Sequence, residues 1–410
     1  MKILNIFKRK YKPILEIASN LGITDSQRIA REFILNEVTP LDKTREKNGK
    51  TIGIDSESDK TVHAIIVSDF LDINNDCNQL ALSLARQIAL ICHYPNFNED
   101  YGSNRTKITI IDVCPNNNIA ALIDALKKET NNLLTYCPWV AKTSSGSIIN
   151  QNLNPLTYID IELNIIHLSG INIEPYINSI TTDSELVSIF HTKSGPINVK
   201  SITGKYVNCK EFAYKPQTST DKIDIYRAMR TNMIYQEGIN LIQVQGINEI
   251  NEYNYPIYTF CKYTRKKTLD VWKKLSIEHK LSSLLCSDCF ESRLRSVGKN
   301  FFDKKRKIEK QDKEEIRKLA YTEHARWNVE KLILGYTPYT KALNYKLFTS
   351  YGDEKRKLIK KLKNVGGANK YHVDLRSCNE LIRVNKEDIK YDYFLTLCIP
   401  HILKREKNKI

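Results

Sequence analysis

The chain has 410 residues, of which 41% are hydrophobic and 27% are charged, and its formal net charge is +16. This composition is typical of a soluble globular protein with two or three domains, and it excludes a disordered, fibrous or collagen-like chain. No apolar run approaches the roughly 20 residues that a membrane-spanning helix needs. Residues Met1–Lys12 lack the apolar core of a secretory signal, and the ten cysteines have no framework spacing. We therefore expect a cytoplasmic protein with reduced thiols.

The positive charge is concentrated in the last third of the chain. Residues 293–410 contain 30 Lys and Arg against 15 Asp and Glu, a net of +15 out of the +16 of the whole chain. This asymmetry favours an anionic partner, either a nucleic acid or a phosphorylated small molecule. Solvated surface lysine is the alternative interpretation, because lysine, isoleucine and asparagine are abundant throughout the sequence.

Residues 1–55 are predicted to form an N-terminal appendage and linker. Asp25 and Ser26 are residues that can cap a helix, and they predict a short helix that ends near Asn36. The following segment, Lys43–Lys60, is polar and contains glycine, which is typical of a loop or linker.

Short apolar runs and segments of helical periodicity alternate from Thr61 to Cys289. The predicted strands are Val62–Val67, Lys107–Asp112, Leu163–Leu168, Glu185–Phe190, Leu241–Val244, Pro256–Cys261 and Leu281–Cys286. The predicted helices are Asn78–His93, Asn118–Leu134, Ile223–Gln236 and Thr264–His279. Apolar strands that alternate with helices indicate a parallel sheet covered on both faces. We therefore predict an α/β fold with a Rossmann-like doubly wound parallel sheet over residues 56–292.

A dinucleotide site of the usual kind needs a Gly-x-Gly-x-x-Gly turn after the first strand. The corresponding turn, Ser68–Asp76, contains no glycine, and its three aspartates would repel a pyrophosphate. Asp112 ends the second strand, where an acid that binds ribose would lie, but an Asp at a strand end is common in α/β folds. Binding of an NAD-type dinucleotide therefore stays open but is disfavoured, and the cofactor is not identified.

Candidate catalytic and metal-binding groups are sparse. Cys286-Ser287-Asp288-Cys289 is a lone Cys-x-x-Cys without the second pair of a zinc ribbon, so two ordinary cysteines are the favoured interpretation. His63 and His167 lie inside apolar strands and are predicted to be hydrogen-bonded core histidines. The sequence offers no convincing pair of nucleophile and base, which argues against an enzyme.

The most informative segment runs from Asp312 to Tyr336. Asp312 with Glu315 resembles a capping box at the start of a helix, and Gly335 is predicted to end that helix. One stripe of this helix combines apolar and acidic side chains: Ile316, Ala320, Glu323, Trp327, Glu330 and Leu334. A carboxylate in an apolar stripe needs a partner, and Arg326 lies three residues further on. These side chains can bind a planar or anionic ligand, or they can form a structural network.

The motif Glu323-His324-x-Arg326-Trp327, followed by Lys331 and Gly335-Tyr336, resembles the signature of the Ryr domain, the helical repeat of ryanodine receptors. Downstream, His372-Val373-Asp374-Leu375 is similar to the family's His-x-x-Leu motif. The resemblance covers about residues 312–404. A long lysine-rich insertion, Lys341–Lys370, departs from the family pattern. On this basis residues 293–410 are predicted to be a small, basic, mostly α-helical Ryr domain.

The resemblance implies a function as well as a fold. Prokaryotic Ryr domains are often fused to Rossmann-like domains, and such proteins act as sensors of nucleotide-like ligands, some of them in defence or stress systems. The family pattern maps a ligand site to these residues: Glu323, His324, Arg326, Trp327, Tyr336 and His372. We therefore expect a non-catalytic bacterial sensor of a small anionic, nucleotide-like ligand, and assembly into a homo-oligomer stays open.

Two other functions compete with this prediction. The basic clusters Lys304–Lys307 and Lys355–Lys363 could bind nucleic acid phosphates, and four aromatic side chains could stack on bases: Tyr339, Tyr345, Phe348 and Tyr351. No known nucleic-acid-binding module is present, so this alternative comes second. A nucleotide-dependent enzyme of the α/β domain comes third, because the phosphate-binding glycines are missing.

Overall fold

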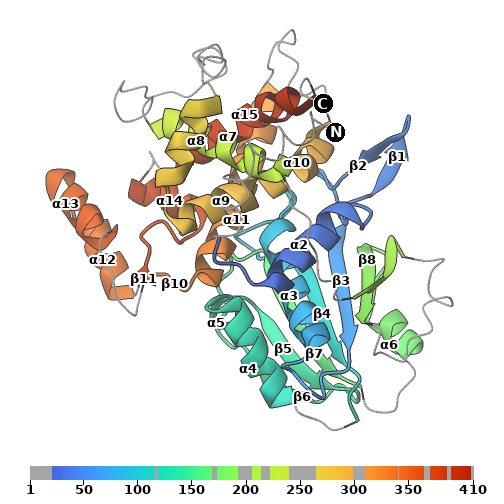
Figure 1. The fold of residues 1–410 in the computed structure, drawn as a ribbon. Helices are drawn as coiled ribbons and strands as arrows, with labels where there is room; N and C mark the ends of the chain where they lie inside the picture. Colours follow the sequence, from blue (N-terminus) through green and yellow to red (C-terminus); the bar gives the residue numbers. More distant parts are fainter. Residues whose placement is uncertain are drawn as a thin grey trace.

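Figure 1 shows the fold of the chain in a computed structural model. The structure describes residues 21–115, 119–168, 173–192, 206–213, 222–239, 265–298, 310–339, 341–363, 370–385 and 389–407. The strands predicted at Leu241–Val244 and Pro256–Cys261 lie outside these residues.

The centre of the fold is a seven-stranded sheet with the order β6-β5-β7-β4-β3-β8-β9. Its strands are β3 (Thr61–Ser68), β4 (Thr106–Asp112), β5 (Trp139–Thr143), β6 (Ile148–Gln151), β7 (Ile161–His167), β8 (Glu185–Thr192) and β9 (Asn208–Phe212). All neighbours are parallel except the antiparallel hairpin of β5 and β6. The predicted α/β fold with a Rossmann-like parallel sheet is confirmed.

The sheet is covered on both faces, which is why its central strands are apolar along their whole length. In β3 every residue except Thr61 is buried. Val62, Ala64 and Ile66 face the larger core, together with helices α2 (Asp25–Asn36), α3 (Asp76–Ile91) and α4 (Ile119–Thr130). Ile65 and Val67 point to the other face, where α6 (Ile173–Ile180) packs. This alternation follows from the two-residue period of a strand.

The second half of the described chain is mostly helical and lies at one end of the sheet (Figure 1). Its helices are α7 (Lys222–Ile239), α8 (Arg265–Lys274), α9 (Ile277–Asp288), α10 (Phe290–Val297), α11 (Lys310–Ile333), α12 (Lys341–Thr349), α13 (Gly352–Lys363), α14 (Cys378–Asn385) and α15 (Ile389–Lys407). Helix α15 packs on α7 and α11, and α7 packs on α9. Three short elements complete the chain: helix α5 (Leu133–Tyr136), hairpin β1–β2 (Arg45–Lys47, Lys50–Ile52) and pair β10–β11 (Tyr336–Thr337, Lys370–Tyr371).

The strand predicted at Leu281–Cys286 is wrong, because these residues belong to helix α9. Ser276 caps this helix, and its hydroxyl accepts a hydrogen bond from the backbone N–H of His279. Leu281, Leu284 and Leu285 are buried at helical spacing. The helix predicted at Thr264–His279 is accordingly divided in two, since α8 ends at Lys274. Helix α11 begins at Lys310, so Asp312 lies inside the helix and does not cap it.

One apolar core includes side chains from all three predicted parts of the chain. Phe33 of α2, Leu80 of α3, and Val329 and Leu332 of α11 belong to it. Two ion pairs join the same parts: the buried pair of Arg31 and Asp288 at 2.6 Å and the partly buried pair of Arg295 and Asp42 at 2.7 Å. The boundaries at residues 55 and 292 stay predictions. Among the described residues, no helix combines the length and apolar composition that a membrane span requires.

Candidate functional site

Helix α11 carries the motif singled out in the sequence. Gly335 follows its end with a φ of +85°, the left-handed conformation that favours glycine, and its N–H donates to the carbonyl of Leu332 at 3.0 Å. The chain then turns into β10, which pairs with β11 in parallel. Tyr336 and His372 are brought close to α11 by this pairing, although 36 positions separate them in the sequence.

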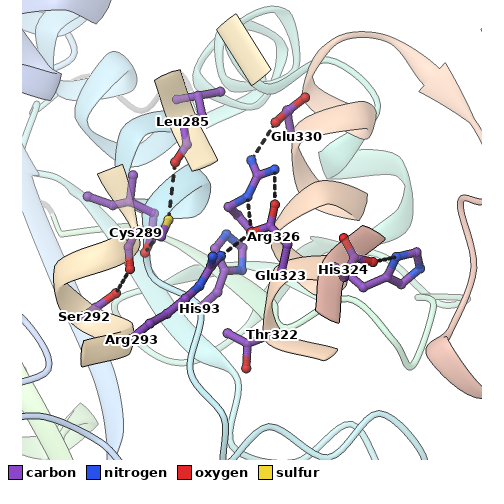
Figure 2. Close-up of polar contacts among 12 residues, drawn as sticks. His93, Leu285, Cys289, Ser292, Arg293, Thr322, Glu323, His324, Arg326 and Glu330 are labelled. Carbon is purple, nitrogen blue, oxygen red and sulfur yellow. Dashed lines mark hydrogen bonds and ion pairs between the residues drawn. The ribbon is translucent and has the colours of Figure 1, made fainter. Parts of the chain in front are cut away.

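Glu323 and Arg326 lie in a buried ion-pair network (Figure 2). Arg326 donates from Nε and Nη2 to both carboxylate oxygens of Glu323, at 3.0 and 2.9 Å, and from Nη1 to Glu330 at 2.5 Å. Arg293 of α10 also donates to Glu323. Arg326 is 1% exposed and Glu323 is 2% exposed. These contacts match the structural alternative, in which the motif fixes the helix against its neighbours.

The electrostatics of this network favour the charged forms of Glu323, Arg293 and Arg326. Burial alone would raise the pKa of Glu323, but Arg293 and Arg326 outweigh it and lower that pKa to about 2. Burial lowers the pKa of Arg326, but Glu323 and Glu330 raise it well above its ordinary range. Arg326 therefore has its donors directed at the side chains of Glu323 and Glu330.

His324 is buried beside this network and is hydrogen-bonded to the segment that contains Arg376. Its Nε2 donates to the backbone carbonyl of Arg376 at 3.0 Å, and its Nδ1 lies 3.4 Å from a carboxylate oxygen of Asp392. Burial lowers the pKa of His324, but Asp392 more than compensates, so the pKa lies above its ordinary value. His324 also borders a cavity of about 50 Å³ between α11 and the sheet domain, which has room for a few water molecules only.

Three partly exposed rings form a cluster on the other side of the motif. The ring centroids of Trp327 and His372 are 4.8 Å apart, and those of Tyr336 and His372 are 5.6 Å apart, both in edge-to-face geometry. His324 stacks on Trp327 from the buried side, with centroids 5.8 Å apart and an interplanar angle of 16°. We refer to Trp327, Tyr336 and His372 as the aromatic cluster.

Two ammonium groups accompany the aromatic cluster. Lys331 Nζ lies 5.6 Å from the Trp327 ring centroid and 5.3 Å from that of Tyr336. Lys370, which is exposed, places its Nζ 5.4 Å from the Tyr336 ring. Glu278 of α9 accepts hydrogen bonds from Lys331 at 2.8 Å and from the Tyr336 hydroxyl at 3.0 Å. Rings and cations at these distances suit a planar, anionic ligand.

The structure thus divides the six predicted site residues. Trp327, Tyr336 and His372 meet in the aromatic cluster, and His324 supports it from below. Glu323 and Arg326 belong to the buried network. Lys331 was not among the predicted site residues, although it belongs to the motif and lies one helical turn from Trp327. Lys370 and Glu278 carried no signal, because tertiary packing alone brings them to the cluster.

His63 and the Cys-x-x-Cys motif are packed in the protein core. His63 Nδ1 lies 2.8 Å from Glu185 and its Nε2 lies 2.8 Å from Thr109, as expected of a core histidine. Cys286 of α9 and Cys289, between α9 and α10, are both buried, and burial raises the pKa of both thiols. Thiols of this kind are poor nucleophiles at neutral pH.

Comparison with known proteins does not name the family. No family model matches the sequence, and no curated protein or solved structure is similar to it at a significant level. The Ryr resemblance therefore stays a hypothesis that rests on the motif residues and their downstream partners.

Proposed function

We propose that the protein is a non-catalytic sensor of a small anionic, nucleotide-like ligand, which binds at the aromatic cluster in a Ryr-like domain. The proposal rests on one observation: the ammonium groups of Lys331 and Lys370 lie close to the partly exposed rings of the aromatic cluster. A base would stack on Trp327 or His372, and phosphate would be neutralised by Lys370 at the surface.

In this proposal the two halves of the motif have different tasks. Glu323 and Arg326 are positioning residues, because Glu323 joins α11 to Arg293 of α10, and Arg326 is buried with its donors on Glu323 and Glu330. Trp327 and Lys331 belong to the half that meets the ligand. Lys331 contacts both halves, since it also lies 3.4 Å from Glu330 of the buried network. A ligand that attracts Lys331 would weaken that contact and pass its effect into the helical core.

A thermal-shift screen of AMP, ADP, ATP and NAD tests the proposal. A ligand at 100 times its Kd stabilises the folded state by about 2.7 kcal/mol, so a micromolar binder raises the Tm measurably. The shift should disappear in Trp327→Ala and shrink in Lys370→Gln. Tyr345→Ala, an exposed aromatic on α12, serves as the control. A nucleotide shift that survives both changes would place the ligand elsewhere, and the absence of any shift would remove the proposal.

Nucleic-acid binding is a second candidate, favoured by the position of α12 and α13. These helices extend from the body of the molecule (Figure 1), and Tyr345 and Tyr351 are 72% and 79% exposed. Tyr339 is buried and therefore cannot stack on a base, and the side chain of Phe348 is not among those that the structure describes. Single-stranded RNA binding that falls steeply with salt and is lost in Tyr351→Ala would support this candidate over the first.

A further inference from the structure

Side chains from three adjacent strands converge at the carboxyl edge of the sheet. Asp69 follows β3 directly, Asp112 is the last residue of β4, and Cys114 lies two residues further on. The ligand atoms of these three residues lie within 4.8 Å of one another. His167, the last residue of β7, stands behind them with its Nδ1 3.2 Å from Asp112 Oδ2.

The backbone holds this cluster in place. Asp112 Oδ1 accepts the N–H of Phe70 at 3.2 Å and the N–H of Cys114 at 2.9 Å, so one carboxylate ties together the loops after β3 and β4. Asp69 Oδ1 accepts the N–H of Leu71 at 3.0 Å. Asp112 and Cys114 are buried, whereas Asp69 is partly exposed. The cluster is therefore preorganised and can be reached from solvent on the Asp69 side.

The cluster lies at a place where parallel sheets commonly bind ligands. From β3 the chain proceeds to β4 and β7 on one side, and it later returns to β8 on the other side of β3. In open parallel sheets, ligands bind outside the carboxyl ends of the strands at such a change of direction. The loop after β3 reaches this position without glycine, because the Asn78 side chain donates to the carbonyls of Asp69 and Asp72 at 2.8 and 2.7 Å.

The chemistry of the three side chains indicates which kind of ligand the cluster would bind. Within the described ranges no Lys or Arg forms an ion pair with Asp69 or Asp112, and the basic side chain beside Asp112 is that of His167. Two carboxylate oxygens and one thiolate sulfur suit a borderline-soft divalent ion. Tetrahedral zinc needs ligand atoms about 3.3–3.8 Å apart, which this cluster reaches with small movements. His167 would act from outside the coordination sphere by orienting the Asp112 carboxylate.

We infer that Asp69, Asp112 and Cys114 form a zinc site with three protein ligands and one position open to solvent. This site does not depend on the aromatic cluster. Helix α11 lies at the opposite, amino edge of the sheet, where its residue Leu332 accepts a hydrogen bond from the N–H of Asn132, ahead of β5, at 3.1 Å. The nucleotide proposal can therefore fail while the zinc site stands, and the reverse also holds.

Metal titration of the full chain tests the inference. After dialysis against chelator, Zn²⁺ is titrated in competition with a chromophoric chelator, and Co²⁺ is titrated while its absorption spectrum is recorded. Asp69→Asn is the first variant, because Asn keeps the hydrogen bond to the Leu71 N–H and the residue is partly exposed. Cys114→Ser is the second, with Cys209→Ser on β9 as its matched cysteine control. Circular dichroism shows whether each variant is folded.

We expect one equivalent of Zn²⁺ in wild type and in Cys209→Ser. Removing a ligand should weaken binding at least as much as removing an outer partner, about 10–100-fold, in both Asp69→Asn and Cys114→Ser. Cobalt should show the thiolate charge-transfer band in wild type, and the band should be lost in Cys114→Ser. A wild-type chain that binds no stoichiometric Zn²⁺ would overturn the inference. So would binding that Asp69→Asn and Cys114→Ser leave unchanged.

Discussion

Lys331 lies between the rings of Trp327 and Tyr336, with its Nζ 5.6 Å from one centroid and 5.3 Å from the other. The same ammonium group lies 2.8 Å from Glu278 and 3.4 Å from Glu330. Lys331 therefore contacts the aromatic cluster and the buried network at once. It is the side chain through which occupation of the rings would reach the ion pairs of α11.

Replacing Lys331 should cost stability even without ligand. Lys331→Met keeps the apolar stem but leaves the buried Glu330 carboxylate with less positive charge around it. We expect the free energy of unfolding to fall by about 1–3 kcal/mol. Urea denaturation measures this, and Lys346→Met on the exposed side of α12 should change it by less than about 0.5 kcal/mol. Equal effects of the two substitutions would show that the contacts of Lys331 do not stabilise the protein.

Glu323→Gln should be more damaging, because it removes the carboxylate that pairs with the buried Arg293 and leaves Arg326 with Glu330 alone. Breaking a buried ion pair by removing one partner costs about 3–5 kcal/mol. The matched control is Glu314→Gln on the same helix, where an exposed pair with Arg317 contributes at most about 1 kcal/mol. Urea midpoints of the two variants decide the question. If Glu323→Gln is as stable as wild type, the network is not a stabilising feature.

Acid should unfold the protein partly through Glu185. Burial raises the pKa of Glu185, but hydrogen bonds and charge from His63 and Lys107 lower it to about 2, below its ordinary value of 4.5. A carboxylate whose pKa is depressed by folding contributes stability above pH 4.5 and loses it as the pH falls toward 2. Glu185→Gln cannot titrate, so its stability should fall less steeply over this interval. Parallel pH profiles of wild type and variant would contradict this account.

Thiol reactivity should follow burial. Cys77 is partly exposed, whereas Cys286 and Cys289 are buried, and burial raises the pKa of Cys289 to about 12. In the native protein, iodoacetamide should label Cys77 first and leave the Cys-x-x-Cys pair unmodified until the chain unfolds. Peptide mass mapping over a time course checks the order. Early labelling of Cys286 or Cys289 would show that this motif is accessible and would reopen a redox role.

The central strands could be predicted from the sequence because both of their faces are buried. β3, β4, β7 and β8 are buried along most of their length and contain short apolar runs, a pattern that a parallel sheet covered on both faces favours. Strand β6 was not predicted, since all four of its residues are exposed and no burial pattern marks it. The run Leu281–Cys286 is short enough to fit either a strand or a helix, and the Ser276 cap decides for the helix.

The division of the motif could not be predicted from helical spacing. Glu323 and Trp327 are four residues apart and fall on one stripe, so a sequence pattern assigns them to one surface. Their environments differ because different elements pack against them: Arg293 of α10 reaches Glu323, while His372 beside β11 reaches Trp327. Both partners come from distant parts of the chain, and only the tertiary structure shows which half is buried.

Tryptophan fluorescence tests the central claim most directly, since a base that stacks on Trp327 quenches its emission. The chain has three tryptophans, and Trp272 is buried in a separate helical core. The proposal predicts saturable quenching of wild type by the nucleotide that gives the largest thermal shift, and loss of that quenching in Trp327→Phe. Quenching of equal size in Trp327→Phe, or none in wild type, would contradict ligand binding at the aromatic cluster.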